Sequence, residues 1–419
     1  MDGMKMKTEE MSLWSKHYVK LLIANLLIAS CMFFHNAVTT LYVVSIGGTA
    51  AYAGVMLTCF TIVATIMRMV SGRLLDKKGR RKMILLGLVV YAAATASLNI
   101  PFLPYLPVAR ALQAIGYSTI TTGISVAVAD VTPIPKMGEG LGYYILTNNL
   151  ATALGPVIAL WIYSIAQNYA TVYYASIVLL AIAFIIILFC RYETDGLFFD
   201  RKQSYELAVL GERAIMAEKG GEEKRSFLAT VFEKKAVPST ICSIFIYLPH
   251  GAIVAYIVLF ANSISIEQAS LFFMLQAAMT IVSRMAFAKL SDRYPPLLSI
   301  IPGALVLALG YFLLMKAPDR HSLFYIAGAA LGMGSGIANP ALNAEAVRYV
   351  PQRRRGAASA TFFMSNDIGI GAGGLIWGRI LDRSGFPHVF LGCVICIFIS
   401  IVLSILFFSR KREAVSRAE

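Results

Sequence analysis

Residues 68–82 read RMVSGRLLDKKGRRK and lie between two long apolar runs. Asp76 follows Gly72 by four residues, and a run of basic residues begins directly after it, at Lys77. A weaker copy, SRMAFAKLSDR, occupies residues 283–293. Basic clusters beside apolar runs are typical of the cytoplasmic ends of transmembrane helices, so the stretch predicts a connection between two such helices. Its second copy predicts that the chain contains an internal repeat.

The composition of the whole chain is that of a membrane protein. Of its 419 residues, 58% are hydrophobic and 14% are charged, and the mean hydropathy is +0.69, values that exclude an ordinary soluble domain. The net charge of +14 arises from short basic clusters between the apolar runs. This charge pattern indicates a lipid bilayer, and not nucleic acid, as the partner of the chain.

Twelve apolar segments are long enough to cross a bilayer, which requires about 20 residues per helix. They lie near residues 18–44, 51–74, 82–100, 103–129, 138–165, 170–190, 236–262, 266–289, 297–316, 322–349, 355–381 and 387–409. The sequence therefore predicts an all-α membrane protein with a six-helix half at residues 1–190, a linker at residues 191–235 and a second six-helix half at residues 236–419.

The distribution of basic residues predicts the orientation of the helices. With both termini in the cytoplasm, all but five of the 37 lysines and arginines fall at or near the inner face; the exceptions are Arg110, Lys316, Arg320, Arg379 and Arg383. We therefore expect a multi-pass protein of the plasma membrane with both termini in the cytoplasm. The linker at residues 191–235 is then cytoplasmic, and is either a solvated tether or a regulatory segment.

The two halves align at an offset of 215 to 218 residues. Matched pairs are His35 with His250, Arg68 with Arg284, Asp76 with Asp292, Asn148 with Asn366, and Asn149 with Asp367. Two matched halves are typical of secondary transporters, which hold the substrate between the halves near the middle of the membrane.

Three motifs of the chain resemble those of the major facilitator superfamily. GRLLDKKGRRK at residues 72–82 is similar to the loop motif of that family, and RALQAIG at residues 110–116 is similar to its fourth-helix motif. LGPVIAL at residues 154–160 resembles the Gly-Pro motif of the drug:proton antiporter branch, although Ala159 and Leu160 replace a glycine pair. The resemblance implies twelve transmembrane helices in two pseudo-symmetric six-helix bundles. It also implies a hinge in the fifth helix at Gly155 and Pro156.

The resemblance further implies a conformational latch at one face of the membrane. In the family, the loop after the second helix braces the start of the eleventh helix, so Asp76 is expected near the Arg353–Arg355 segment, and Asp292 near the start of the fifth helix. The expected latch residues are Arg68, Gly72, Asp76, Gly79, Arg80, Arg284, Asp292, Arg353, Arg354 and Arg355. The alternative is that the basic run only fixes the topology.

Polar side chains occur on eight of the twelve segments. The segments near 82–100, 170–190, 297–316 and 387–409 are almost bare of them and are expected to face lipid. An ionised side chain inside the bilayer costs about 2.5 to 3.5 kcal/mol, so the polar groups are expected to face a wet or paired interior. The expected transport cavity and coupling residues are His35, Asn36, Arg110, Gln113, Tyr117, Asn148, Asn149, His250, Asn339, Asn343, Asn366 and Asp367.

Four of these residues are candidates for coupling transport to protons. Asp367 is the only carboxylate near the centre of a segment, and is either a proton carrier or a structural partner of Asn149 or an arginine. Arg110, by the resemblance, takes part in coupling or substrate contact; the alternative is a structural anchor. Histidine side chains can exchange protons near neutral pH, so His35 and His250 are expected either to take part in proton transfer or only to pack in the interior.

Several motifs that would indicate other functions are absent or misleading. Gly369, Gly371 and Gly374 spell G-x-G-x-x-G, but no strand precedes them, so they are expected to allow close helix packing. The sequence contains no P-loop, no HExxH motif and no Ser-Lys or Ser-His arrangement. Cys393 and Cys396 spell CxxC, but they lie in an apolar run without ligand partners and are expected to be apolar filler. We therefore expect neither an enzyme nor a bound cofactor or metal, and an ion gradient as the energy source.

These observations predict a secondary active transporter that works by alternating access. The expected activity is export of a small amphipathic or drug-like compound in exchange for protons, by a monomer. Proton-coupled uptake of an organic anion or metabolite remains an alternative, and a membrane receptor without transport activity is a third. The sequence does not identify the transported compound.

Overall fold

A computed structural model of the protein describes residues 13–133, 136–194, 233–293, 297–348, 350 and 355–416. Over these residues the chain forms twelve long α-helices, which agree with the predicted segments to within a few residues at most ends. They are α1 (Lys16–Ser45), α2 (Ala50–Lys78), α3 (Arg80–Ser97), α4 (Leu106–Val131), α5 (Met137–Ala166), α6 (Tyr169–Leu188), α9 (Val237–Ser263), α10 (Ala269–Arg293), α11 (Leu297–Lys316), α12 (Ser322–Arg348), α13 (Arg355–Ser384) and α14 (Phe386–Ser416).

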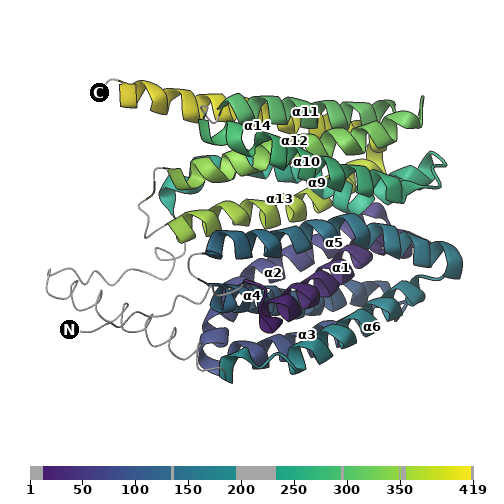
Figure 1. Ribbon diagram of the computed structural model, residues 1–419. Coiled ribbons are helices and arrows are strands. Elements are labelled where there is room, and N and C mark those ends of the chain that lie inside the picture. Colours follow the sequence, from purple (N-terminus) through teal and green to yellow (C-terminus); the bar gives the residue numbers. More distant parts are fainter. Residues whose placement is uncertain are drawn as a thin grey trace, which may run out of the picture.

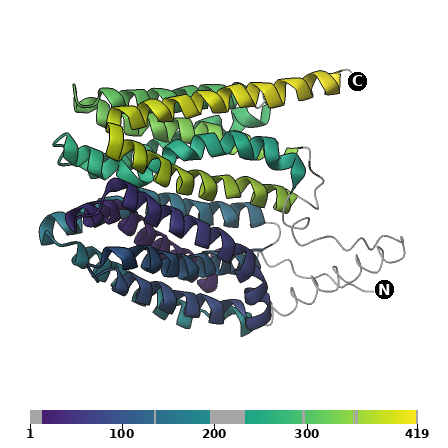
Figure 2. The same ribbon diagram turned by 180° about the vertical axis from the view of Figure 1, so that it is seen from behind.

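The helices form two bundles that lie side by side. Helices α1–α6 make the first bundle and α9–α14 the second, with α2 and α5 facing α13 and α10 across the boundary (Figure 1). Helix α1 begins, α6 ends, α9 begins and α14 ends at the same end of the bundles, which we call the terminal end; the opposite end is the distal end (Figures 1 and 2). This arrangement confirms the predicted fold class. Most of the predicted linker, residues 195–232, lies outside the described residues.

Local hydrogen bonds explain where α1, α2 and α3 begin. The side chains of Ser15 and Thr49 accept hydrogen bonds from backbone N–H groups in the first turns of α1 and α2, each at 3.2 Å. Gly79 separates α2 from α3 with a φ of +87°, a conformation that favours glycine. The Oε1 atom of Glu193 accepts a hydrogen bond of 2.6 Å from the backbone N–H of Arg80, at the start of α3.

Four helices form the outer faces of the molecule. Helices α3 and α6 lie at one edge and α11 and α14 at the other (Figure 1), and each exposes large apolar side chains such as Val89, Val178, Leu309 and Ile395. This confirms that the four segments present apolar faces outward, as lipid contact requires. Over the described residues, nine helices are long and apolar enough to cross a membrane; α3, α12 and α13 are not among them.

Glycines allow α13 to lie against α2 and α9 at close range. A Cβ atom at Gly54 would lie 2.2 Å from the carbonyl oxygen of Gly374, and one at Gly373 would lie 2.2 Å from that of Leu248. A Cβ atom at Gly371 would lie 2.1 Å from the hydroxyl oxygen of Thr61. The predicted packing role of the glycine motif in α13 is confirmed.

Candidate substrate cavity

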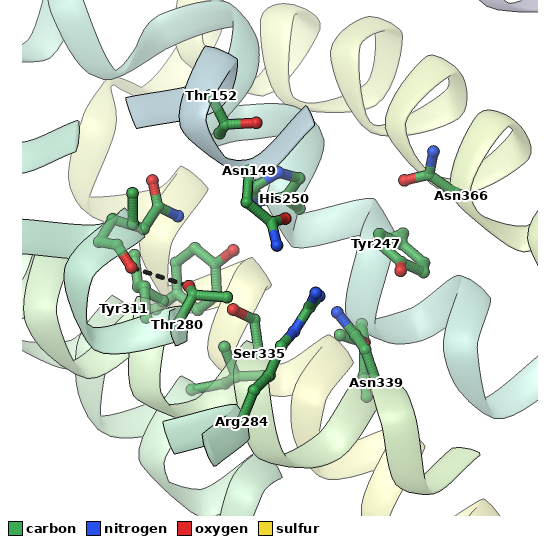
Figure 3. Close-up of a pocket in the computed structure, with 15 residues that line it drawn as sticks. Asn149, Thr152, Tyr247, His250, Thr280, Arg284, Tyr311, Ser335, Asn339 and Asn366 are labelled. Atoms are coloured by element: carbon green, nitrogen blue, oxygen red, sulfur yellow. Dashed lines mark hydrogen bonds between the residues drawn. The ribbon is translucent and has the colours of Figure 1, made fainter. Parts of the chain in front are cut away.

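A cavity of 260 Å³ lies beside the boundary between the bundles, largely within the second one (Figure 3). Helices α9, α10, α11 and α12 supply most of its wall, α5 closes one side, and α13 contributes one residue. The lining residues are Asn149, Thr152, Ile246, Tyr247, His250, Gln276, Ala277, Thr280, Arg284, Leu307, Tyr311, Leu331, Ser335, Asn339 and Asn366. The lining thus combines many polar side chains with the apolar side chains of Ile246, Leu307 and Leu331, which suits an amphipathic solute.

Hydrogen bonds between the bundles close the distal side of the cavity. The hydroxyl of Thr40 donates to the carbonyl oxygen of Ala255 at 2.5 Å, and the hydroxyl of Tyr256 donates to that of Ala50 at 3.1 Å. The carboxylate of Asp382 accepts hydrogen bonds from the N–H groups of Ala50 and Ala51 at 3.2 and 3.0 Å. Ala255 follows the cavity residue His250 by only five residues, about 7.5 Å along the helix, so this distal seal lies just beyond the cavity.

The cavity wall contains one permanently charged side chain, that of Arg284 in α10. Figure 3 shows the nitrogen ends of Arg284, Asn149 and Asn339 turned toward the same space. None of the described residues that line the cavity is an aspartate or glutamate. The Nε atom of Arg284 and the Oδ1 atom of Asn339 are buried without a hydrogen-bond partner among the described residues.

An ion pair joins the two bundles on the terminal side of the distal seal. A guanidinium nitrogen of Arg68 in α2 lies 2.8 Å from the Oδ2 atom of Asp367 in α13, and the hydroxyl of Thr65 lies 3.3 Å from the same oxygen. The Asp367 side chain is 10% exposed and that of Arg68 is 41% exposed.

Arg110 and His35 lie inside the first bundle and do not reach the 260 Å³ cavity. The guanidinium of Arg110 donates to the side-chain oxygens of Gln113 and Asn36, each at 3.0 Å, and lies 4.8 Å from the centre of the Phe60 ring. His35 is fully buried, and its Nδ1 atom lies 3.2 Å from the hydroxyl of Tyr91 and 3.3 Å from the side-chain nitrogen of Gln113. Arg110 borders a space of 10 Å³ near the distal seal.

The predicted cavity residues thus fall into three groups. Those that line the 260 Å³ cavity are Asn149, His250, Asn339 and Asn366. Those in the buried network of the first bundle are His35, Asn36, Arg110 and Gln113. Those in neither are Tyr117, Asn148, Asn343 and Asp367, of which Tyr117 packs against the rings of Phe60 and Tyr91.

Only some of the predicted latch residues lie in the described part of the chain. Arg68 bonds to Asp367 of the other bundle, whereas Arg80 pairs with Asp130 of its own bundle at 2.7 Å and Arg284 lines the cavity. A Cβ atom at Gly72 would meet nothing within 4 Å. The side chains of Asp76, Asp292 and Arg355, and residues Arg353 and Arg354 as a whole, lie outside the described part of the chain.

The predicted hinge in the fifth helix lies within a continuous helix. Pro156 is an internal residue of α5, and the backbone of Gly155 packs against Phe33 of α1, where a Cβ atom would lie 2.6 Å from the Cβ atom of Phe33. Pro156 borders a second small space, of 30 Å³. Both residues therefore pack near the distal seal and not in the wall of the large cavity.

Several residues of the cavity wall were not predicted as cavity residues from the sequence. Gln276, Thr280 and Arg284 recur every four residues along α10, and Ser335 and Asn339 do the same along α12. That spacing is the signal that identifies them, because it places a polar stripe on one face of each helix. Helix α11 contributes Leu307 and Tyr311 to the wall, so only its other face is turned outward.

Solved structures of transporters share this architecture. A nucleoside transporter, NupG, superposes with a TM-score of 0.67 at 14% identity, over 94% of this chain and 99% of that one. A POT family transporter in complex with 5-aminolevulinic acid superposes with a TM-score of 0.73 at 14% identity, over 94% of this chain and 96% of that one. At these identities the likeness concerns the fold alone.

Two kinds of relative are similar in sequence. The Staphylopine export protein of Staphylococcus aureus (strain Mu50 / ATCC 700699) is 24% identical over 402 residues, which cover 91% of this chain and 94% of that protein. An uncharacterised MFS-type transporter of Burkholderia mallei (strain SAVP1) is 34% identical over 103 residues, or 24% of this chain and 25% of that protein.

The family profile of the Major Facilitator Superfamily matches residues 21–229 and 239–419, nearly the whole chain. The twelve helices, their two bundles and the cavity beside the boundary accord with this match. The chain is therefore a member of the Major Facilitator Superfamily of membrane transporters.

Proposed function

We propose that this protein exports a small amphipathic organic compound from the cytoplasm in exchange for protons, by alternating access. The observation that carries the proposal is a cavity sealed on its distal side, beside the ion pair of Arg68 and Asp367, which joins the bundles. We place the protein in the cell membrane with the terminal end of its bundles on the cytoplasmic side. Because the distal side is sealed, the described conformation is then the inward-facing one. We propose that the unit of function is a monomer.

In this scheme, Asp367 is the proton carrier. Its carboxylate oxygen, 2.8 Å from Arg68, holds α13 against α2 as long as it is ionised. Binding of a proton turns the carboxylate into a neutral carboxyl group and removes the charge attraction across the boundary. A few kcal/mol is enough to move a two-state equilibrium over most of its range, so protonation favours a different arrangement of the bundles.

Export is supported by the relative that is similar over almost the full length of both chains. That relative is named for the export of staphylopine, and its 24% identity covers 94% of its length. The mixture of polar and apolar side chains that line the cavity supports a small amphipathic solute. His250 in the wall, and Arg110 and His35 in the first bundle, remain further candidates for substrate contact or proton transfer.

Everted membrane vesicles test the proposal. Respiration acidifies their interior, and acridine orange reports the pH difference while a library of amphipathic compounds is added outside. An exporter carries a compound inward and protons outward, so at least one compound is expected to dissipate the pH difference with wild-type protein but not with Asp367→Asn. A library that has no effect, or an equal effect with the variant, contradicts the proposal.

Proton-coupled uptake of an organic anion or metabolite is the second candidate. The observation that favours it is the cationic wall of the cavity, where Arg284 has no carboxylate beside it among the described lining residues. Uptake predicts that intact cells accumulate a labelled compound and that this accumulation is lost when the pH gradient is abolished. It also predicts that compounds added to everted vesicles leave the pH difference unchanged. The two directions therefore give opposite results in the same pair of preparations.

A further inference from the structure

The internal repeat pairs Arg68 with Arg284 and Asp367 with Asn149. In three dimensions each arginine lies opposite a residue of the other bundle. Arg68 of α2 faces Asp367 of α13, and Arg284 of α10 lies across the cavity from Asn149 of α5 (Figure 3). At the second boundary an amide thus stands in the repeat position of the carboxylate.

This replacement leaves the charge of Arg284 uncompensated by its repeat partner. An amide oxygen accepts a hydrogen bond but carries no charge, whereas a carboxylate neutralises a guanidinium and often binds it through two parallel bonds. No described side chain in the cavity wall is acidic, and the Nε atom of Arg284 is buried without a hydrogen-bond partner among the described residues. A half-buried cation with these surroundings favours an anion from outside the protein.

We infer that the transported compound is an organic anion and that Arg284 binds its anionic group. The side-chain amides of Asn149 and Asn339, turned toward the same space, add neutral hydrogen-bond donors around that group (Figure 3). The apolar part of the compound would contact Leu307 and Leu331, which also line the cavity. This inference rests on the proposed transport function and names the class of its substrate.

The other charged or titratable groups near the cavity do not remove the need for an anion. His250 and Tyr247 of α9 and Tyr311 of α11 line it, and none of these side chains is an anion in its ordinary state near neutral pH. The carboxylate of Asp367 is held by Arg68. Arg284 is therefore the group that distinguishes an anionic from a neutral solute.

A charge-selective labelling experiment tests the field of Arg284 without a known substrate. Ser335→Cys places a thiol in the cavity wall, in a protein whose native cysteines are replaced by serine or alanine. The thiol is reacted with sulfonatoethyl methanethiosulfonate, an anion, and with trimethylammonioethyl methanethiosulfonate, a cation. The rate with the anionic reagent divided by the rate with the cationic reagent is the labelling ratio. This ratio is expected to fall about three- to tenfold when Arg284 is changed to Gln, because the positive charge concentrates anions in the cavity.

Two further variants test whether the labelling ratio depends on the charge of Arg284 and on the missing carboxylate at position 149. Asn149→Asp supplies the missing carboxylate and is expected to lower the ratio as Arg284→Gln does. Arg379→Gln removes the same charge from an exposed position in α13 and is expected to leave the ratio unchanged. An unchanged ratio in Arg284→Gln, or an equal fall in Arg379→Gln, overturns the inference.

Matched ligand pairs test recognition itself. Purified wild-type protein is heated with a panel of aromatic acids and their amides, such as N-acetylphenylalanine with N-acetylphenylalaninamide and hippurate with hippuramide. At least one acid is expected to stabilise the protein more than its amide, with a loss of affinity of about tenfold or more in Arg284→Gln and a smaller loss in Arg284→Lys. If no acid is preferred to its amide, the inference is wrong.

The inference and the proposed function fail in different ways. Labelling ratios and thermal stabilisation depend on Arg284 but not on a proton gradient. If they respond to Arg284→Gln while everted vesicles show no proton exchange, the anion site stands and proton-driven export does not. If the vesicles exchange protons for neutral compounds while the ratio is unchanged, export stands and the anion site does not.

Discussion

At the scale of single residues, two arginines at matching positions of the repeat have different partners. Arg68 lies 2.8 Å from a carboxylate oxygen of Asp367, whereas Arg284 shares a cavity with Asn149. Burial of an ion pair gives little net stability, but removal of one partner leaves the other uncompensated. Because Asp367 has an amide, Asn149, at its repeat position, Arg68 makes a contact between the bundles, whereas Arg284 is left as the proposed anion-binding group.

Replacement of Asp367 by Asn is expected to abolish proton-driven transport, because the amide cannot take up a proton near neutral pH. It is also expected to lower the free energy of unfolding by about 1 kcal/mol, since Arg68 loses its partner but is 41% exposed. Thermal unfolding and vesicle flux measure the two effects.

The double variant Arg68→Gln/Asp367→Asn serves as the comparison. It is expected to lose less stability than the sum of its single variants, because two neutral amides leave no charge unpaired, yet to remain inactive in proton-driven transport. Asp367→Glu keeps the carboxyl group and is expected to retain part of the activity. Full transport activity in Asp367→Asn contradicts the assigned role.

At the scale of helices, the boundary depends on the close approach of α13 to α2. Gly54 and Gly374 lie at their crossing, and the nearest atoms to an added Cβ at Gly54 include a backbone oxygen that no side-chain rotation can move. Helices in membranes associate largely by such close packing, because lipid offers no hydrophobic drive between them. The glycines therefore serve the contact between bundles and not the binding of a nucleotide.

Gly54→Ala is expected to destabilise the described conformation by about 1 to 3 kcal/mol, because a Cβ at 2.2 Å from the Gly374 oxygen forces the helices apart. The thermal unfolding temperature of the purified protein measures this. Gly142→Ala in α5 is the matched control, since its Cβ meets nothing within 4 Å and alanine favours the helix. Equal unfolding temperatures for the two variants contradict the packing argument.

At the scale of the whole molecule, the two bundles are closed at the distal end and hold a cavity behind that seal. Thr40, Tyr256 and Asp382 make hydrogen bonds across the boundary there, while the cavity residues lie closer to the terminal end. In the proposed alternating access, these bonds would break together when the distal end opens. The proposed mechanism therefore assigns to the seal part of the free-energy difference between the two conformations.

Asp382→Ala is expected to shift the equilibrium toward the distal-open conformation by about 1 kcal/mol, or about fivefold, because two N–H groups at the start of α2 lose their acceptor. Val254→Cys, which borders the small spaces behind the seal, reports the shift through its rate of reaction with an impermeant thiol reagent added at the distal face. Asp319→Ala removes an exposed charge from another distal connection and is expected to have no effect. An unchanged rate in Asp382→Ala means that these bonds do not hold the seal.

Much of the fold follows from local properties of the sequence. Apolar runs of about 20 residues predict the helices, and the repeat between Arg68 and Arg284 predicts two bundles. The residues of the cavity are harder to predict from the sequence. A polar residue in a helix predicts a position away from lipid, but not whether that position is in the cavity or inside one bundle. Asn149 and His250 were expected in the cavity and line it, whereas His35 and Arg110 bond within the first bundle.

The sequence by itself determined the number and extent of the apolar helices, the glycine positions that allow close packing, and the matched halves. Hydropathy, glycine spacing and repeat are properties of neighbouring or aligned residues, so they can be read along the chain. Only the tertiary structure decided that Asp367 binds Arg68 and that Arg284 lies free of a carboxylate in a cavity with Asn149. The partner of a buried charge depends on how helices from distant parts of the chain cross, and no local pattern fixes that crossing.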